Sequence, residues 1–265
     1  MTPRPTLVMA AHGTRRRQGE EVLCGLRDLV RRARPGHRVE LAYLEISSPG
    51  LAGTLAALDG PVVVVPMLLA GGYHVHVDLP AVLAATRPDA AVARPLGPHH
   101  LLTGLLARRL GRAGLRATDA VILGAAGSSD AGALADVRAA ARLLSVRLSR
   151  PVTAAFAAAG TPKLGETLDR LRSGPAPRVA VASYLLAPGH FQDRLLECGA
   201  DLVAEPLGAD PGLAELVWTR FDEATSHAVS HTVAGAVAGV AAGSGALRGG
   251  LQAQLPDDLL GPLVA

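Results

Sequence analysis

Short apolar runs alternate with longer segments of helical periodicity through the first part of the chain. The runs at 6–11 and 61–70 are almost wholly aliphatic, which is typical of parallel strands covered on both faces. The segment 15–33 has apolar residues at the spacing of one helix face and is predicted to be a helix. The same alternation predicts strands at 38–45 and 90–97 and helices at 49–58, 78–88 and 99–114.

This order of segments starts again near residue 120. AVILGAAGSSD matches TLVMAAHGTRR, VTAAFAAAGTPKL matches VELAYLEISSPGL, VAVASYLLAPG matches VVVVPMLLAGG, and LVAEPLG matches AVARPLG. The offset stays nearly constant, from 111 between Pro95 and Pro206 to 117 between Gly72 and Gly189. Four ordered matches at such an offset indicate an internal duplication.

The duplication predicts an α/β fold with two tandem βαβα-type domains. Each is expected to hold a mostly parallel four-stranded sheet flanked by helices. The expected domains are 1–115, which carries the site, 116–226, a degenerate repeat, and 227–265, a flexible tail rich in Gly and Ala.

Composition narrows the classes of protein. The formal net charge is only +3, Arg supplies most of the positive charge, and there is no long basic run, so we expect an anionic small molecule rather than nucleic acid. Cys24 and Cys198 are too far apart in sequence for a CxxC site and are expected to be reduced thiols. A signal peptide and an apolar span of about 20 residues are both missing from the pattern, so we expect a cytoplasmic protein that does not enter the membrane.

The two halves differ in the polar residues that follow their strands, where ligands bind in doubly wound sheets. In the first half these residues are His12, Glu45 and His74, whereas Ala126 and Ala158 align with the first two. Packing residues are needed in both halves but a chemical site only in one, so the group is predicted to be functional. Taken singly, each has an ordinary alternative: a hydrogen-bonded core histidine, or a glutamate that caps a helix or pairs with an arginine.

The third loop also differs between the halves. GGYHVHVDLP in the first half is replaced by the shorter PGHFQD, in which His190 aligns with Tyr73 directly or with His74 after a one-residue shift. His76 is expected to face away from His74 if the loop is extended, as a surface residue or a hydrogen-bond partner. Asp78, just before Leu-Pro, is predicted to be a helix N-cap.

Two imidazoles and a carboxylate suit a divalent first-row metal such as iron, cobalt, nickel or zinc. Three protein ligands leave coordination positions open, as a reactive site requires. Gly71 and Gly72 would let a flat ligand approach the backbone closely.

AHGTRR, YLEISSPGL, VVVVPMLLAGGYHVHVDLP and the duplication together resemble the sirohydrochlorin chelatase family, the class II tetrapyrrole chelatases of siroheme and cobalamin biosynthesis. The resemblance covers residues 6–226 and fits the long, duplicated form in which the N-terminal half keeps the site. It implies that a divalent metal enters a planar tetrapyrrole bearing several carboxylates while two pyrrole protons leave.

The resemblance also implies roles for individual residues. His12 and His74 would share metal delivery and proton removal, with Glu45 as ligand, proton relay or substrate contact. Arg15, together with Arg16 and Arg17, could meet the substrate carboxylates, although a solvated helix start is the alternative. The macrocycle would be lined by Leu69, Ala70, Gly71, Gly72 and Tyr73.

The metal, Co²⁺ or Fe²⁺ with Ni²⁺ also compatible, would be a substrate, so no resident cofactor is implied. A duplicated chain can form alone the two-domain arrangement that a half-length chain would form as a dimer, which favours a monomer.

Two rival functions remain. The first is a non-catalytic carrier of tetrapyrrole or metal with the same ligands. The second is a phosphotransfer hydrolase of the histidine phosphatase type, but Ala11 stands where that chemistry needs an arginine, and Glu45 would be unexplained. His227 and His231 in the tail could share a helix face, with a solvated helix end as the alternative.

Overall fold

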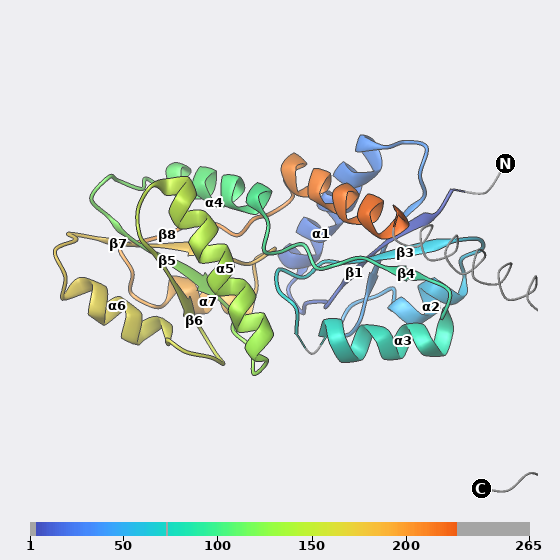
Figure 1. Ribbon diagram of the computed structural model, residues 1–265, viewed down its shortest axis with the longest axis horizontal. Helices are drawn as coiled ribbons and strands as arrows, with labels where there is room; N and C mark the ends of the chain where they lie inside the picture. The colour runs from blue at the N-terminus through green and yellow to red at the C-terminus, as the bar shows by residue number, and fades with distance from the viewer. Residues whose placement is uncertain (1–3, 73, 227–265) are drawn as a thin grey trace, which may run out of the picture. The chain divides into compact units, whose positions relative to one another are not determined.

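The computed structural model describes residues 4–72 and 74–226, leaving aside the side chain of residue 74, and contains two parallel four-stranded sheets (Figure 1). The expected tail at 227–265, with His227 and His231, lies outside the described residues, as does Tyr73. The first sheet has the order β2-β1-β3-β4, formed by β1 (Thr6–Ala11), β2 (Val39–Tyr43), β3 (Val62–Pro66) and β4 (Ala91–Val92). The second has the order β6-β5-β7-β8, formed by β5 (Ala120–Ala125), β6 (Val152–Phe156), β7 (Val179–Ser183) and β8 (Leu202–Val203).

Helices connect the strands as the alternation predicts. In the described chain, no helix is both long enough and apolar enough to cross a lipid bilayer. The helices of the first repeat are α1 (Arg17–Ala33), α2 (Leu51–Ala56), a π-helical turn η1 (His74–Asp78), α3 (Leu79–Thr86) and α4 (His100–Arg112). Those of the second are α5 (Ala131–Leu148), α6 (Leu164–Arg172), α7 (His190–Leu196) and a last helical segment at 211–226.

The two repeats match in their buried positions as well as in sequence. The buried residues of α1 and α5 fall at the same offset, so that Leu23 corresponds to Val137 and Val30 to Leu144. The bridge between Tyr43 and Gly50 beside the first sheet returns as a bridge between Phe156 and Lys163 beside the second. The duplication therefore extends to the three-dimensional structure.

Each sheet is buried on both faces because its strands are almost wholly apolar. In β1, Leu7 and Met9 belong to a large core that contains residues of both repeats, while Val8 and Ala10 face a separate cluster formed with α2 and α3. The shared core joins the two sheets into one folded unit.

Two expectations about the third loop are corrected by the structure. The chain becomes helical directly after Gly72, whose carbonyl accepts the N–H groups of Val75 and His76, each at 2.9 Å, so η1 precedes the predicted helix. Asp78 is not an N-cap, because its φ of −67° and ψ of −50° are already helical and its side chain makes no capping hydrogen bond.

The closing helix of each repeat packs on the other repeat. α4 contacts α5 and β7, and the segment 211–226 lies beside α1 (Figure 1). On that segment, Trp218 donates from Nε1 to the carbonyl of Val30 at 3.0 Å. Arg34, the C-cap residue of α1, forms two hydrogen bonds with Asp222, at 2.7 and 2.6 Å. The repeats thus exchange helices.

The exchange predicts that Trp218 stabilises the whole unit. Its side chain is buried, packs edge-on against Phe221 and His37, and carries the guanidinium of Arg34 over its ring at 4.5 Å. Replacing Trp218 by Ala should lower the free energy of unfolding by about 3–5 kcal/mol, and Trp218→Phe by less. Urea unfolding followed by circular dichroism measures both, and a loss of under about 1 kcal/mol for the alanine variant would contradict the packing.

The N-terminus of α4 predicts a pH dependence of stability. His99 accepts the N–H of Leu101 on its Nδ1 at 3.3 Å, and burial, with smaller contributions from His100 and Arg220, lowers the pKa of His99 to about 4. Between about pH 6.5 and 4 the unfolded chain binds this proton and the folded chain does not, so stability falls as the pH drops through that window.

The control is His99→Asn, which keeps an oxygen acceptor at the cap but does not titrate. The difference in unfolding free energy between pH 7 and pH 5 should be smaller in His99→Asn than in the wild type. Some dependence should persist, because burial and nearby arginines also lower the pKa of His37. Equal pH dependence in both proteins would show that His99 carries no proton linkage.

Candidate functional site

Three strand ends meet at one edge of the first sheet. β1 lies between β2 and β3 and is parallel to both, so their carboxyl ends are neighbours. His12 follows β1, Glu45 lies just beyond β2, and η1, which begins at His74, follows β3. The fold therefore brings the backbone of all three predicted ligands to the edge where parallel sheets bind ligands.

Hydrogen bonds between the loops after β1 and β2 fix the first two positions. Leu44 donates to the carbonyl of Ala11 at 2.8 Å, and Glu45 donates to that of His12 at 3.0 Å. Gly13 has a φ of +102°, and a Cβ there would lie 2.2 Å from the carbonyl oxygen of Glu45. Only glycine fits at this turn.

A serine completes the connection between these loops. The Oγ of Ser47 accepts the N–H of Thr14 at 3.1 Å and donates to the Thr14 carbonyl at 3.0 Å. The turns that follow His12 and Glu45 are therefore held together by side-chain as well as backbone hydrogen bonds.

The second repeat keeps the same backbone arrangement without the chemistry. Ala158 donates to the carbonyl of Ala126 at 2.9 Å, as Glu45 does to His12. Gly127 has a φ of +97°, and a Cβ there would lie 1.9 Å from the carbonyl oxygen of Ala159. The alanines thus occupy the backbone positions of the histidine and the glutamate.

The side chains at this edge differ in exposure. His12 is half-buried and Glu45 is exposed. In the part of the chain that the structure describes, no three His, Cys, Asp or Glu side chains are grouped so as to hold a metal ion. The side chain of His74 is outside that description, so the three-residue site stays a prediction.

The segment before η1 rests on the second repeat. The carbonyl of Leu69 accepts the hydroxyl of Tyr184 at 3.0 Å, and the N–H of Gly71 donates to Oδ2 of Asp136 at 2.8 Å. A Cβ on Gly72 would lie 3.5 Å from the Cβ of Ala133. Leu69, Ala70, Gly71 and Gly72 are all buried or half-buried.

Sequence reasoning missed Asp136 and Tyr184. The comparison of the halves considered polar residues that occur in the first half but not in the second. Asp136 and Tyr184 are polar residues of the second half that the first half lacks. Asp136 aligns with Val22 and Tyr184 with Met67, so a comparison in both directions would have found them.

The glycines of this loop make room for protein groups. A Cβ on Gly71 would lie 3.0 Å from Nε2 of His76 and 3.4 Å from Oδ2 of Asp136. His76 is exposed, and its imidazole lies against Gly71. His190, which aligns with Tyr73 or with His74, is also exposed and begins α7.

The three arginines at the start of α1 have different surroundings. Arg16 pairs with Asp193 of the second repeat, and Arg17 pairs with Glu21 one turn along α1 at 2.9 Å. Arg15 is exposed and forms no ion pair with any described residue. Of the three, Arg15 is the one left for an external carboxylate.

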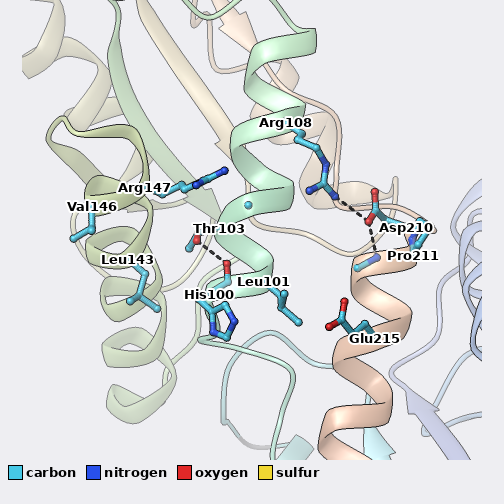
Figure 2. Close-up of a pocket in the computed structure, with 12 residues that line it drawn as sticks. His100, Leu101, Thr103, Arg108, Leu143, Val146, Arg147, Asp210, Pro211 and Glu215 are labelled. Carbon is cyan, nitrogen blue, oxygen red and sulfur yellow. Dashed lines mark hydrogen bonds and ion pairs between the residues drawn. The ribbon is translucent and has the colours of Figure 1, made fainter.

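A cavity of about 740 Å³ opens at another place, among α4, α5 and the start of the segment 211–226 (Figure 2). Figure 2 shows the ion pair of Arg108 with Asp210, at 3.0 Å, at one side and Arg147 on α5 at the other. None of the predicted ligands lines it. Its walls are His100, Leu101, Thr103, Gly104, Arg108, Leu143, Val146, Arg147, Asp210, Pro211, Gly212 and Glu215.

Comparisons with known proteins agree with this architecture. The CbiX family model matches residues 6–113 and again residues 120–224. A sirohydrochlorin cobaltochelatase of Methanococcoides burtonii is 24% identical over 126 residues, which are 41% of this chain and 96% of the relative. The chloroplastic sirohydrochlorin ferrochelatase of Arabidopsis thaliana is 29% identical over 113 residues, which are 39% of this chain and 50% of the relative.

Among solved structures, SirB from Bacillus subtilis with Fe³⁺ superposes with a TM-score of 0.72 over 84% of this chain and 96% of that one. At 20% identity this likeness establishes the fold, and it confirms the predicted fold class. The two family-model matches cover most of the chain and confirm the predicted family and duplication. The protein belongs to the CbiX/SirB family of sirohydrochlorin chelatases, with two copies of the family domain in one chain.

Proposed function

We propose that the chain is a sirohydrochlorin chelatase that inserts Co²⁺ or Fe²⁺ into a sirohydrochlorin-type tetrapyrrole, in cobalamin or siroheme biosynthesis. One observation carries the proposal. Both repeats form the same loop hydrogen bonds, but His12 and Glu45 stand on them in the first repeat and Ala126 and Ala158 in the second. Packing needs the loops in both copies, whereas a reaction needs its ligands in one.

The reaction joins four ring nitrogens to one metal ion and releases two N–H protons. His12, His74 and Glu45 hold the incoming ion at one face of the macrocycle. Imidazole titrates near neutral pH, so the histidines can also accept the protons as the metal–nitrogen bonds form. Glu45 is exposed at the edge of the sheet and supplies negative charge as a ligand, a relay or a substrate contact.

The ring lies against the segment from Leu69 to Tyr73, which leads into the turn that begins at His74. Arg15, which no described carboxylate engages, binds a peripheral carboxylate of the substrate by charge-assisted hydrogen bonds. The tetrapyrrole and the metal are both substrates, so the chemistry needs no resident cofactor.

The donor set accepts cobalt, iron and nickel alike, and metal supply in the cell then decides the product. This agrees with relatives named as a cobaltochelatase and as a ferrochelatase. Cys24 and Cys198 are free, which fits a reducing compartment such as the cytoplasm. The shared core and exchanged helices within one chain favour a monomer.

The test is metal insertion by purified variants. We expect His12→Ala and His74→Ala each to lower the insertion rate by about 10²-fold or more, because each removes both a metal ligand and a proton acceptor. His190→Ala, at the aligned loop of the second repeat, should retain the wild-type rate. Mixing protein with sirohydrochlorin and Co²⁺ or Fe²⁺ and following the absorbance change gives the rates, and circular dichroism checks the fold.

Two results would overturn the proposal at different levels. If the wild-type rate does not exceed the uncatalysed rate with either metal, the chain is a carrier of tetrapyrrole or metal. If both histidine variants insert metal as fast as the wild type, the activity stands and the residue assignment is wrong.

A further inference from the structure

We propose that Asp136 and Tyr184, in the repeat that lacks the ligands, are positioning residues that hold the loop leading to His74 in its working conformation. The proposal rests on the proposed function, since it gives that loop its role. We call the two side chains the loop anchor.

The anchor binds the backbone on both sides of Ala70. Tyr184 donates its hydroxyl to the carbonyl of Leu69 at 3.0 Å, and Asp136 accepts the N–H of Gly71 at 2.8 Å. The carbonyl of Gly72, the residue after Gly71, accepts the first N–H groups of η1. The chain is therefore fixed immediately before the turn that carries the predicted ligand.

The hydroxyl of Tyr184 is in the protonation state that its bond requires. Tyr184 is 3% exposed, and burial, with a smaller contribution from the charge of Asp136, raises its pKa, so its hydroxyl keeps the proton that it donates. A carboxylate accepts the Gly71 N–H as a charge-assisted bond, which is stronger than a bond between neutral groups.

Gly97 leaves space for the hydrogen bond between Tyr184 and Leu69. A Cβ on Gly97 would lie 2.2 Å from the Oη of Tyr184 and 2.3 Å from the carbonyl oxygen of Leu69. Any larger residue at Gly97 would therefore displace one partner of the bond. The segment after β4 thus takes part in the same arrangement.

The anchor acts in one direction only. By the repeat offset, Val22 stands for Asp136 and Met67 for Tyr184, and neither can form the reciprocal hydrogen bond. Pro188, which stands for Gly71, has no N–H to donate.

The counterpart of the Leu69 carbonyl has a different partner. The carbonyl of Leu186 accepts the N–H of Gly208 at 2.9 Å, within its own repeat. Packing between repeats would serve both copies equally, but among the described residues the two hydrogen bonds of the loop anchor form only at the loop that carries a candidate ligand.

The experiment uses the full chain and removes one bond at a time. Tyr184→Phe removes only the hydroxyl, and Asp136→Ala removes the acceptor. Asp136→Asn is the conservative rescue, because its amide oxygen still accepts the Gly71 N–H without the charge. The matched control is Ser183→Ala, next to Tyr184 on β7, which loses another buried hydroxyl bond, to the carbonyl of Ala204 at 2.6 Å.

Two readouts are needed: kcat and KM for metal insertion into sirohydrochlorin, and amide hydrogen exchange of residues 69–76. We expect Tyr184→Phe and Asp136→Ala to lower kcat about 10-fold with little change in KM, since a misplaced ligand slows the reacting step. Exchange in 69–76 should become faster in both. Asp136→Asn should recover most of kcat, and Ser183→Ala should change neither readout.

The positioning role is overturned if exchange in 69–76 is unchanged in Tyr184→Phe and Asp136→Ala. It is also overturned if Ser183→Ala lowers kcat as much as Tyr184→Phe, or if Asp136→Asn is as slow as Asp136→Ala. A wild-type protein without insertion activity would overturn the proposed function instead, and the exchange measurement would still decide whether the anchor orders the loop.

Discussion

The candidate site depends on one constraint, the closure of the loop after β1 onto the loop after β2. Gly13 takes a backbone conformation that a side chain would block, and this lets Glu45 donate to the carbonyl of His12 at 3.0 Å. The parallel pairing of β1 and β2 brings the two positions to the same edge of the sheet, and this bond fixes the spacing of their backbones. Gly127 imposes the same closure where only alanines follow, so the constraint belongs to the fold and the chemistry is added to it.

The exchanged helices make the second repeat necessary to the first. The segment 211–226 covers α1 through Trp218, and α4 leaves its own sheet to pack on α5 and β7. A repeat separated from the other would expose both of these apolar faces to water. The second repeat has alanines at Ala126 and Ala158 but is still needed for folding, because the first repeat packs against it.

Much of this was predictable from local patterns. Continuous aliphatic runs fix the buried strands, and the nearly constant offset between repeats fixes which residues correspond. The helix exchange was not predictable, because the spacing of Leu102, Leu105 and Leu106 shows which face of α4 is apolar but not which sheet that face meets. The fourth strands shortened to two residues each, since pairing depends on the neighbouring strand as well as on propensity.

The third loop was the hardest part to predict, and the reason is physical. Asp78, just before Leu-Pro, has the local composition of a helix start. The helical structure nevertheless begins before Asp78, because the carbonyl of Gly72 accepts the N–H groups of Val75 and His76 and starts the turn at His74. Such competition between backbone acceptors is settled by tertiary contacts, and here the contacts come from the other repeat, through Asp136 and Tyr184.

A division of labour between the repeats follows from these contacts. Under the proposed function, a ligand at His74 must hold its position while the ion enters and leaves, and an unanchored loop would lose backbone entropy each time it ordered. Hydrogen bonds to Leu69 and Gly71 order the backbone when the protein folds, so the loss of backbone entropy occurs once rather than at each binding event. The second repeat, which has alanines at the positions of His12 and Glu45, supplies these bonds. Val22 and Met67 stand at these positions in the first repeat, and the counterpart loop is held within its own repeat, through the N–H of Gly208.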